Sequence, residues 1–550
     1  MFYFKKSYIM RFLVVFSLVI LPFFSFPQNQ NPKLVIGIVI DQMRYDYLTR
    51  YWDKYGDGGF KKLVNEGFNC KNANYNYMPT YTGPGHASIY TGTTPENHGI
   101  ISNTWYNKLA NVSTYCTGDY MVNTVGSQSF NGKMSPKHML GTTITDELKL
   151  ATNNKGKIIG MSLKDRGAIL PAGHKADAAY WYDGGLVGKW ITSSFYMPVL
   201  PEWVQKINNI NNSDKYLSKP WETLLPIEDY TESMPDNNPY EGTFVTEAKP
   251  VFPHNLPTLR DSNFDYELIK YTPFGNTILK ELALEGIKNE KLGKDEFTDF
   301  LAISFSSPDF IGHKYGPLSI EVEDTYLRLD KDLEEILNYV EQHFEKEDVL
   351  IFLTADHGVV NVPQYLMDNN IPAGYFDNNQ LINELSAYLK KEYDTDTLVM
   401  NVSNYQVFLN HEYINKNNWN VASIENAIAQ FLLTKKGIAK AVTASNLKAT
   451  EFRNGILANT QRGFHQVRSG DVLYVLESGW VPAGYATGTT HGSPYNYDTH
   501  VPLIWYGAGV KKGESSKFVV IPDIAATIAE LLEIQAPSAC TGKPIYELLK

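Results

Sequence analysis

The chain has 550 residues, enough for one large α/β domain with insertions or for about two or three domains. Hydrophobic residues make up 43% of it and charged residues 20%, which is a globular rather than a disordered composition. Its formal net charge is −11, and no basic run follows the N-terminus. This charge argues against a protein that coats nucleic acid.

The N-terminus has the pattern of a secretory signal peptide. Lys5, Lys6 and Arg11 come before or at the start of an apolar run over residues 12–24, and polar residues follow. The run is too short to span a bilayer comfortably. We therefore predict that residues 1–27 are a signal peptide, that the protein is exported to the periplasm or secreted, and that no stable membrane span remains. A poorly marked cleavage site leaves an uncleaved anchor as the alternative.

The chain contains three cysteines, Cys70, Cys116 and Cys540. Because export favours disulfide formation, we expect Cys70 to pair with Cys116 and Cys540 to remain an odd thiol. No Cys-x-x-Cys spacing occurs, so a zinc site built from thiolates is not expected.

One loop, Pro79 to His86, leads into an apolar segment and predicts the start of a helix. Pro84 suits the first helical turn, and Gly83 and Gly85 permit a tight backbone. Thr82 would then carry its hydroxyl at a helix N-terminus, where free N–H groups and the macrodipole favour a phosphate or an oxyanion. Taken alone, the motif is also compatible with an ordinary capped helix start.

Apolar, β-branched runs predict a central sheet. Without the alternation of a half-exposed strand, they indicate strands buried on both faces, at residues 34–40, 156–162, 297–305 and 349–353. Later strands are expected at 472–476 and 501–506, and helices at 58–67, 134–148, 276–286, 321–344 and 522–532. The predicted fold class is therefore α/β, with a large, mostly parallel central sheet flanked by helices on both faces.

Changes in composition divide the chain into a core and two insertions. We expect a catalytic core in three parts, residues 28–180, 273–362 and 467–550. Residues 181–272 are rich in Pro, Asn, Trp and Tyr without periodicity, which is typical of a functional insertion. Residues 363–466 mix helix and strand patterns and predict a second, inserted α+β subdomain. Both insertions would cap the core.

Carboxylates and imidazoles follow the predicted strand ends, where α/β sheets place their ligands. Three clusters do so, Asp41, Asp309 with His313, and Asp356 with His357, and a fourth, His491, lies in a Gly- and Thr-rich loop before a strand. Carboxylate plus imidazole is a ligand mix for Zn²⁺. Any one cluster is more often a surface turn or a helix cap, but four of them beside Thr82 predict metal binding.

These motifs together resemble the alkaline phosphatase superfamily, which also includes nucleotide pyrophosphatases and phosphodiesterases. The resemblance spans about residues 33–549 and rests on Thr82-Gly-Pro-Gly-His86, Asp309-Phe-Ile-Gly-His313, Asp356-His357-Gly358 and His491-Gly492. It implies two Zn²⁺ per chain, one held by Asp41, Asp356, His357 and the nucleophile Thr82, the other by Asp309, His313 and His491. Two metal ions roughly 4 Å apart can clamp the attacking and leaving oxygens of an in-line displacement.

A further stretch, Ser162-Leu-Lys164-Asp-Arg166, and Asn103 resemble the phosphate-irrepressible, PafA-type bacterial alkaline phosphatases. The resemblance implies that Asn103, Lys164 and Arg166 hold the phosphoryl group. Two cations beside the nucleophile suit the dianion of a monoester, whereas a diester carries one charge less and needs room for a second substituent. The predicted function is zinc-dependent hydrolysis of phosphate monoesters through a covalent phosphothreonine, releasing inorganic phosphate. No signature of a third, magnesium site is present.

Two other functions remain open. One is a phosphodiesterase or nucleotide pyrophosphatase that uses the same metals; the other, from a different class, is a metal-binding surface module without activity. A sulfatase is disfavoured because no Cys-x-Pro-x-Arg motif surrounds Thr82. The expected partners are small phosphate monoesters and not nucleic acid. The sequence does not fix the oligomeric state, and a monomer is the working expectation.

Overall fold

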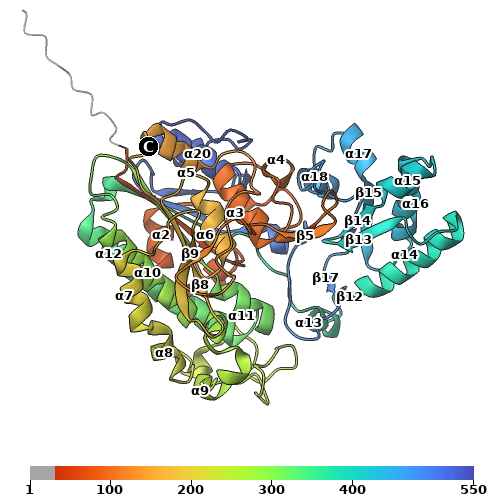
Figure 1. Cartoon of the computed structure of the whole chain (residues 1–550). Coiled ribbons are helices and arrows are strands. Elements are labelled where there is room, and N and C mark those ends of the chain that lie inside the picture. The colour runs from red at the N-terminus through yellow and green to blue at the C-terminus, as the bar shows by residue number, and fades with distance from the viewer. Residues whose placement is uncertain (1–30) are drawn as a thin grey trace, which may run out of the picture. The chain divides into compact units, whose positions relative to one another are not determined.

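The computed structural model describes residues 31–550, so the signal peptide expected over residues 1–27 lies outside the described part. A ten-stranded sheet forms its centre (Figure 1). From one edge to the other the strands are β20 (Gly513–Ser515), β2 (Phe68–Cys70), β19 (Leu503–Gly507), β11 (Val349–Thr354), β1 (Leu34–Ile40), β10 (Asp299–Phe305), β7 (Ile158–Ser162), β8 (Ala178–Asp183), β9 (Lys189–Ser193) and β6 (Thr124–Val125).

The middle of the sheet is parallel and its flanks are mixed. β1 pairs in parallel with β10 and β11, β10 with β7, and β7 with β8. β19 and β9 run antiparallel to their neighbours. Every residue of β1, β10 and β11 is buried, which explains their uninterrupted apolar sequences. The predicted α/β class is confirmed, with the parallel strands confined mainly to the centre.

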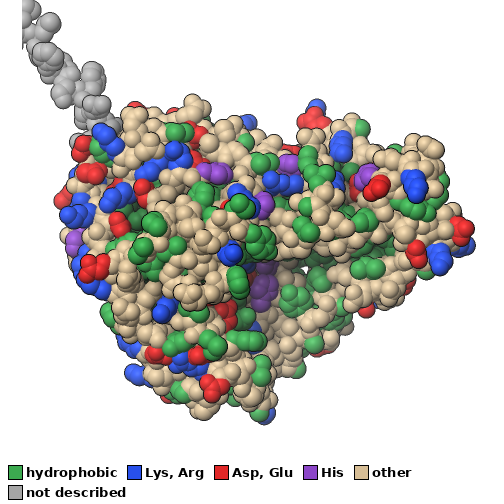
Figure 2. Space-filling view, in the orientation of Figure 1, with side chains coloured by type: hydrophobic (Ala, Val, Ile, Leu, Met, Phe, Trp, Pro, Cys, Tyr) green, Lys and Arg blue, Asp and Glu red, His purple; other side chains and the backbone are tan. Residues whose placement is uncertain are grey.

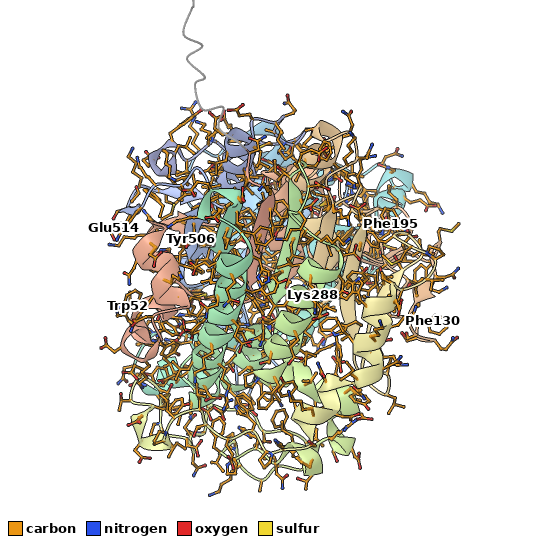
Figure 3. The ribbon with its side chains drawn as sticks, turned by 90° about the vertical axis from the view of Figure 1, so that its left-hand side faces the viewer. Trp52, Phe130, Phe195, Lys288, Tyr506 and Glu514 are labelled. Carbon is orange, nitrogen blue, oxygen red and sulfur yellow. The ribbon has the colours of Figure 1, made fainter. Side chains whose placement is uncertain are left out.

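Helices cover both faces of this sheet. On β7, Gly160 lies against α6 (Asp165–Ala172) and the next residue, Met161, lies against α10 (Phe274–Asn289), so these two helices are on opposite faces. α12 (Ile320–His343) packs beside α10, as Figure 3 shows around the labelled Lys288 of α10. The face of α6 also carries α3 (Thr82–Thr91), α5 (Ile144–Ala151) and α20 (Asp523–Leu532).

The shorter elements connect these layers. Near the sheet lie α1 (Tyr47–Arg50), α2 (Phe60–Glu66), α4 (Pro95–His98), the β4–β5 hairpin (Thr104–Asn107 and Val112–Tyr115) and α11 (Ser307–Tyr315). A small sheet joins β18 (His500–Val501), β3 (Ala73–Asn74) and β21 (Val519–Val520). No helix within residues 31–550 is both long enough and apolar enough to cross a membrane.

The helix expected at residues 134–148 begins only at Ile144. The Thr143 hydroxyl accepts a hydrogen bond from the Asp146 N–H, and the Asp146 carboxylate accepts one from the Thr143 N–H. This capping box fixes the first turn of α5, because it satisfies backbone donors that a longer helix would have used internally. Residues 134–143 are mainly turns and irregular backbone instead.

A second core lies in the inserted subdomain, which Figure 1 shows as the group containing α14–α17. Its sheet has the order β13 (Val399–Ser403), β14 (Gln406–Leu409), β16 (Val472–Leu476) and β15 (Ile438–Thr443). Helices in this part are α14 (Asn378–Tyr393), α15 (His411–Lys416), α16 (Val421–Leu433), α17 (Ala444–Ala449) and α18 (Gly455–Arg462). β16 was expected in the catalytic core, but Val472, Tyr474 and Leu476 pack into the subdomain, which therefore extends past residue 466. β12 (Gly374–Phe376) pairs with β17 (Trp480–Pro482) at its base.

The other expected insertion, residues 181–272, begins inside β8, and β9 also continues the central sheet. Its helices α7 (Glu202–Ile210), α8 (Asn212–Leu217) and α9 (Leu256–Leu259) bring Trp203, Leu217 and Leu256 into the main core. This stretch is therefore packed as part of the core.

The expected disulfide is wrong, since all three cysteines are free. Cys70 lies on β2 near one edge of the sheet, whereas Cys116 follows β5 and lies beside Gly83, whose position would bring a Cβ within 3.3 Å of its Sγ. Burial raises the pKa of Cys70 and of Cys116 to about 12. Both are therefore packing residues rather than reactive thiols.

Candidate active site

Thr82 is the first residue of α3, and its side chain is buried. Tyr81, the residue before it, is extended and forms the N-cap. Gly85 is required one residue after Pro84, because a Cβ there would come within 2.4 Å of the Asp356 carbonyl oxygen. The Gly-Pro-Gly sequence thus lets the first turn of α3 lie directly against the loop that follows β11.

Three carboxylates meet at one edge of the parallel sheet. Asp41 follows β1, Asp356 follows β11, and Asp309 lies in the first turn of α11 after β10. Because β1 pairs with both β10 and β11, their carboxyl ends lie side by side. All three aspartates are buried.

Two sets of possible metal-ligating side chains occur here, each with atoms within 4.8 Å of one another: Asp41, Asp356 and His357, and Asp309, His357 and His491. The rings of His357 and His491 stack at 3.5 Å. His313, one turn after Asp309, places its Nε2 3.1 Å from Asp309 Oδ1. Its side chain is 29% exposed, and Figure 2 shows histidine surface in a hollow near the middle of the face in view.

Backbone carbonyls orient all three imidazoles. Nδ1 of His313 lies 2.8 Å from the Thr489 oxygen, Nδ1 of His357 3.0 Å from the Gly358 oxygen, and Nδ1 of His491 2.7 Å from the Thr80 oxygen. A carbonyl only accepts, so Nδ1 of each ring carries a proton, and Nε2 is the ring atom that is left to contact a metal ion.

These Nε2 atoms face carboxylate oxygens. His357 Nε2 is 3.4 Å from Asp41 Oδ1, and His491 Nε2 is 3.5 Å from Asp309 Oδ1. Among the aspartates and histidines of the two sets, within residues 31–550, three buried atoms lack a hydrogen-bond partner: Asp41 Oδ1, Asp356 Oδ2 and His357 Nε2. Buried acceptor atoms that face one another without a donor between them fit a cation, and a backbone carbonyl bonded to Nδ1 is typical of histidine metal ligands. The residues therefore fit Zn²⁺ at both sets.

Burial sets the electrostatics of the carboxylates. Burial, then the charge of Asp309, raises the pKa of Asp41. Burial and the charge of Asp41 raise the pKa of Asp356 well above its ordinary value. For Asp309 burial also acts upward, but His313 and Lys164 outweigh it and hold the pKa well below the ordinary value. The cluster thus stores charge repulsion that a bound cation would relieve.

We expect zinc to raise the melting temperature of the metal-free protein more at about pH 8 than at about pH 5. Because the pKa values of Asp41 and Asp356 are raised, the folded metal-free protein keeps protons that the unfolded chain releases. The contribution of these two carboxyls to stability is therefore greatest at low pH and is lost as the pH rises, whereas zinc replaces those protons. Scanning calorimetry with and without zinc measures the effect. In Asp41→Asn/Asp356→Asn the effect of zinc on the melting temperature should no longer depend on pH. Equal increases in melting temperature at both pH values in the wild type would contradict the prediction.

Lys164 joins the two ligand sets. Its ammonium lies 2.7 Å from Asp41 Oδ2 and 2.5 Å from Asp309 Oδ2. Lys164 is the N-cap residue of α6, and its backbone N–H donates to Ser162 Oγ at 3.1 Å. Charge on the two aspartates raises its pKa although burial acts in the opposite direction, so the side chain is a buried cation.

Arg166 and Asn103 are held by residues other than the possible metal-ligating carboxylates. Arg166 Nη1 donates to the Tyr115 hydroxyl at 3.0 Å, and that hydroxyl donates to Asp165 at 2.8 Å. Asn103 Oδ1 accepts from the Gly83 N–H at 2.7 Å, next to Thr82. The geometry thus places Asn103 beside the start of α3 and holds Arg166 through Tyr115.

Sequence reasoning missed Gln42. Its backbone N–H donates to Asp356 Oδ1 at 3.1 Å, and its side-chain amide donates to Asp309 Oδ1 at 2.7 Å, so it links the two carboxylates. This geometry uses a left-handed backbone with φ of 67°, which is uncommon for glutamine. Gly312 leaves room for the amide, since a Cβ there would lie 2.0 Å from Gln42 Oε1. A polar residue directly after Asp41 was the only signal for this role.

His86 supports the loop and is not a ligand candidate. Its Nδ1 lies 2.9 Å from the Thr82 oxygen, and its Nε2 lies 2.8 Å from Ser304 Oγ on β10. Burial lowers the pKa of His86 to about 3, so the ring is neutral. It therefore fixes the first turn of α3 against the sheet.

Comparison with known proteins assigns the family. The family model for type I phosphodiesterase / nucleotide pyrophosphatase matches residues 35–500. The chain belongs to this family. Alkaline phosphatase PhoV of Synechococcus elongatus is 44% identical over 96% of this chain and 94% of its own length. A protein of Myroides odoratus named calcium-transporting ATPase is 42% identical over the whole of both chains.

Alkaline phosphatase PafA of Elizabethkingia meningoseptica is 40% identical over 94% of this chain and 95% of its own length. The solved structure of wild-type PafA matches with a TM-score of 0.90 and covers 94% of this chain and 99% of that one. The resemblance to PafA-type alkaline phosphatases indicated by the motifs is thereby confirmed, and so is the alkaline-phosphatase-like fold.

Proposed function

We propose that this protein is a zinc-dependent alkaline phosphatase that hydrolyses phosphate monoesters through a covalent phosphothreonine at Thr82. The observation that carries the proposal is the cluster of buried acceptors, carboxylates and Nε2 lone pairs, beside a helix-terminal threonine. The full-length similarity to PhoV and PafA, both named alkaline phosphatases, supports a phosphoric monoester hydrolase.

Two Zn²⁺ per chain would be held in the two sets that the family resemblance implies, Asp41, Asp356, His357 with Thr82, and Asp309, His313 with His491. His357 lies within reach of both sets in the structure, and His313 contacts Asp309. When bound, zinc supplies Lewis acidity that favours the ionised form of a coordinated hydroxyl and offsets charge on the reacting oxygens.

The chain's own residues carry out the transfer. The Thr82 hydroxyl loses its proton and its oxygen bonds to phosphorus as the bond to the alcohol oxygen breaks, and the alcohol leaves with a proton. The oxygen of a water molecule then bonds to phosphorus as the bond to the Thr82 oxygen breaks, which releases inorganic phosphate, and a proton from that water restores the Thr82 hydroxyl. The N-terminus of α3 favours negative charge at this point. Asn103 is tied to Gly83 through Oδ1, so its NH₂ group is the donor offered to a phosphoryl oxygen.

Lys164 and Arg166 set the preference for a dianion. Lys164 contacts both Asp41 and Asp309, so its ammonium is held at the junction of the ligand sets. Arg166 is fixed by Tyr115, which leaves further N–H groups of the guanidinium to face the phosphoryl oxygens. Two cations and a neutral amide match a group with charge spread over three non-bridging oxygens.

The second candidate function is a phosphodiesterase or nucleotide pyrophosphatase, favoured by the family model that spans residues 35–500. A panel of an aryl phosphate, its methyl diester and the aryl sulfate, assayed on zinc-loaded protein, separates the alternatives. We expect kcat/KM to be highest for the monoester. A preference for the diester would establish the phosphodiesterase instead, and zinc binding without turnover of any ester would indicate an inactive metal-binding module.

The site acts, on this proposal, on small phosphate monoesters outside the cytoplasm. The basic and then apolar N-terminal sequence supports export through a signal peptide over residues 1–27. Fractionation of the source cells tests the export, and N-terminal sequencing of the exported protein tests whether residues 1–27 are removed. Full-length protein retained in the cytoplasmic fraction would contradict the export proposal.

A further inference from the structure

The β13–β14 hairpin of the inserted subdomain ends in a tight turn at Asn404 and Tyr405. Ser403 pairs with Gln406, so the turn has two residues. Both have left-handed backbones, with φ of 51° and 61°. This geometry is typical of a type I′ hairpin, in which asparagine is favoured at the first position. The turn therefore projects as a compact, well-defined tip.

The tip contacts the backbone and side chains on both sides of Asn103. Asn404 Oδ1 accepts from the Ser102 hydroxyl at 3.0 Å, and Asn404 Nδ2 donates to the Thr104 carbonyl oxygen at 2.7 Å. One amide from a segment some 300 residues away thus fixes the residues immediately before and after Asn103. A side chain that holds both neighbours restrains the residue between them.

The same segment is held at three further points by the subdomain. Arg468 Nη1 donates to the Gly99 carbonyl oxygen, and Lys108 Nζ donates to the Ser469 oxygen at 2.9 Å. The rings of Tyr106 and Phe408 meet edge to face at 5.2 Å. The contacts lie on both sides of Asn103, so residues 99–108 are docked on the subdomain as a unit.

Asn103 transmits this placement to the start of α3. Its Oδ1 accepts the Gly83 N–H at 2.7 Å, and Gly83 directly follows Thr82. Asn404 is therefore connected to the residue next to the proposed nucleophile by its hydrogen bonds to Ser102 and Thr104, by the backbone of residues 102–104, and by the hydrogen bond of Asn103 with Gly83. Lost restraint at Asn404 would let the Asn103 amide move away from this position.

Tyr405 gives the tip a second contact with the site. Its phenol group lies close to that of Tyr81, the N-cap residue of α3. The Tyr81 ring in turn meets the His491 ring edge to face at 5.6 Å. The two turn residues are thus linked to the two neighbours of Thr82 in the sequence, Asn404 to Gly83 through Asn103, and Tyr405 to Tyr81.

We infer that Asn404, at the tip of the β13–β14 hairpin, is a positioning residue for phosphoryl transfer that acts through Asn103. The inference rests on the proposed function in one respect, that Asn103 contacts the transferred phosphoryl group. The inserted subdomain then does more than pack on the core, because it supplies part of the rigid support for the phosphoryl-binding residues.

The test is a double-mutant cycle between Asn404→Gly and Asn103→Ala in zinc-loaded protein. Glycine keeps the left-handed turn and removes only the amide. We expect Asn404→Gly to lower kcat/KM for an aryl phosphate by about tenfold and to cause less than about twofold further loss in the Asn103→Ala background. The affinity for inorganic phosphate, measured by isothermal titration calorimetry, should fall in Asn404→Gly and fall little further when Asn404→Gly is added to Asn103→Ala.

The matched control is Asn418→Gly, at an exposed left-handed asparagine of the same subdomain with φ of 56°. It should leave kcat/KM unchanged. A merely structural role of Asn404 would lower the melting temperature or the zinc content but leave kcat/KM per zinc-loaded protein intact, which overturns the inference. If Asn404→Gly lowered kcat/KM by the same factor in the wild type and in the Asn103→Ala background, the inference would also be overturned.

Two provisions keep the result decisive. If Asn404→Gly does not fold, Ser102→Ala removes the other partner of the same hydrogen bond and is put through the same cycle. If the wild type hydrolyses diesters rather than monoesters, the proposed function fails, and the Asn404–Asn103 coupling is measured with the diester and judged by the same criterion.

Discussion

Replacing Thr82 with alanine is expected to abolish turnover while leaving zinc and inorganic phosphate bound. The hydroxyl supplies the atom that bonds to phosphorus, so its removal should lower kcat by roughly 10⁴-fold or more. The carboxylates, imidazoles and cations around it are untouched, and the buried site should therefore retain its ligands. The measurement is steady-state hydrolysis of an aryl phosphate, with zinc content and phosphate affinity determined on the same sample.

Thr82→Ser is the matched control, because it restores a hydroxyl at the same helix-terminal position and should recover much of the activity. Protein quenched in acid during turnover should carry a phosphate on residue 82 in the wild type and in the serine variant, detectable by mass spectrometry. Turnover close to the wild-type level in zinc-replete Thr82→Ala would remove the covalent mechanism.

The candidate site was largely accessible to sequence reasoning because its residues follow buried strands. An unbroken, β-branched apolar run such as residues 34–40 favours a strand covered on both faces, and the polar residue that ends it, Asp41, is then expected at the carboxyl end of the sheet. The same logic placed Asp356 after β11 and Lys164 after β7. At these residues the local sequence pattern predicts the place in the sheet correctly.

The features that the sequence did not predict depend on contacts between distant parts of the chain. β16 has the same apolar character as the central strands, yet it pairs with β14 and β15, because pairing partners are not encoded in the run itself. The pairing of Cys70 with Cys116 was inferred from compartment alone and failed, since Cys70 lies on the sheet and Cys116 under the nucleophile loop. Gln42 needed a left-handed backbone that no neighbouring glycine or proline signals.

The imidazole orientation is a further property that only the folded chain reveals. The carbonyls that fix Nδ1 belong to Thr489, Gly358 and Thr80, and two of these are more than a hundred residues from the histidine that they orient. A histidine in the sequence predicts a ligand type, whereas the acceptor on its far nitrogen decides which atom is available. This arrangement supports metal binding more strongly than the motifs do.

The second large effect is expected at Lys164 and Arg166. Removing a cation that contacts the transition state costs about 10²- to 10³-fold in rate, so Lys164→Ala/Arg166→Ala should lower kcat/KM for a monoester by at least about 10³-fold. A diester presents less charge to these residues and should lose far less. The ratio of monoesterase to diesterase activity should therefore collapse in the double variant.

Lys164 calls for a particular design because it also neutralises Asp41 and Asp309, which belong to different ligand sets. Its removal changes the charge that the metals encounter, so zinc occupancy must be matched before the activities are compared. Arg166→Ala alone isolates the guanidinium, which the structure ties to Tyr115 and not to the carboxylates. Lys175→Ala/Arg453→Ala removes the same charge from exposed positions and controls for long-range attraction of the dianion.

The two substrates make the outcome specific to recognition of charge. If Arg166→Ala lowers monoester kcat/KM at equal zinc and leaves the diester nearly unchanged, the guanidinium contacts the oxygen that the diester has esterified. If both substrates fall by one factor in the double variant, Lys164 and Arg166 support the fold or the metals and do not select the monoester. If the exposed pair produces the same loss, net attraction rather than contact accounts for the effect. Only the first pattern agrees with a monoesterase whose selectivity resides in these two cations.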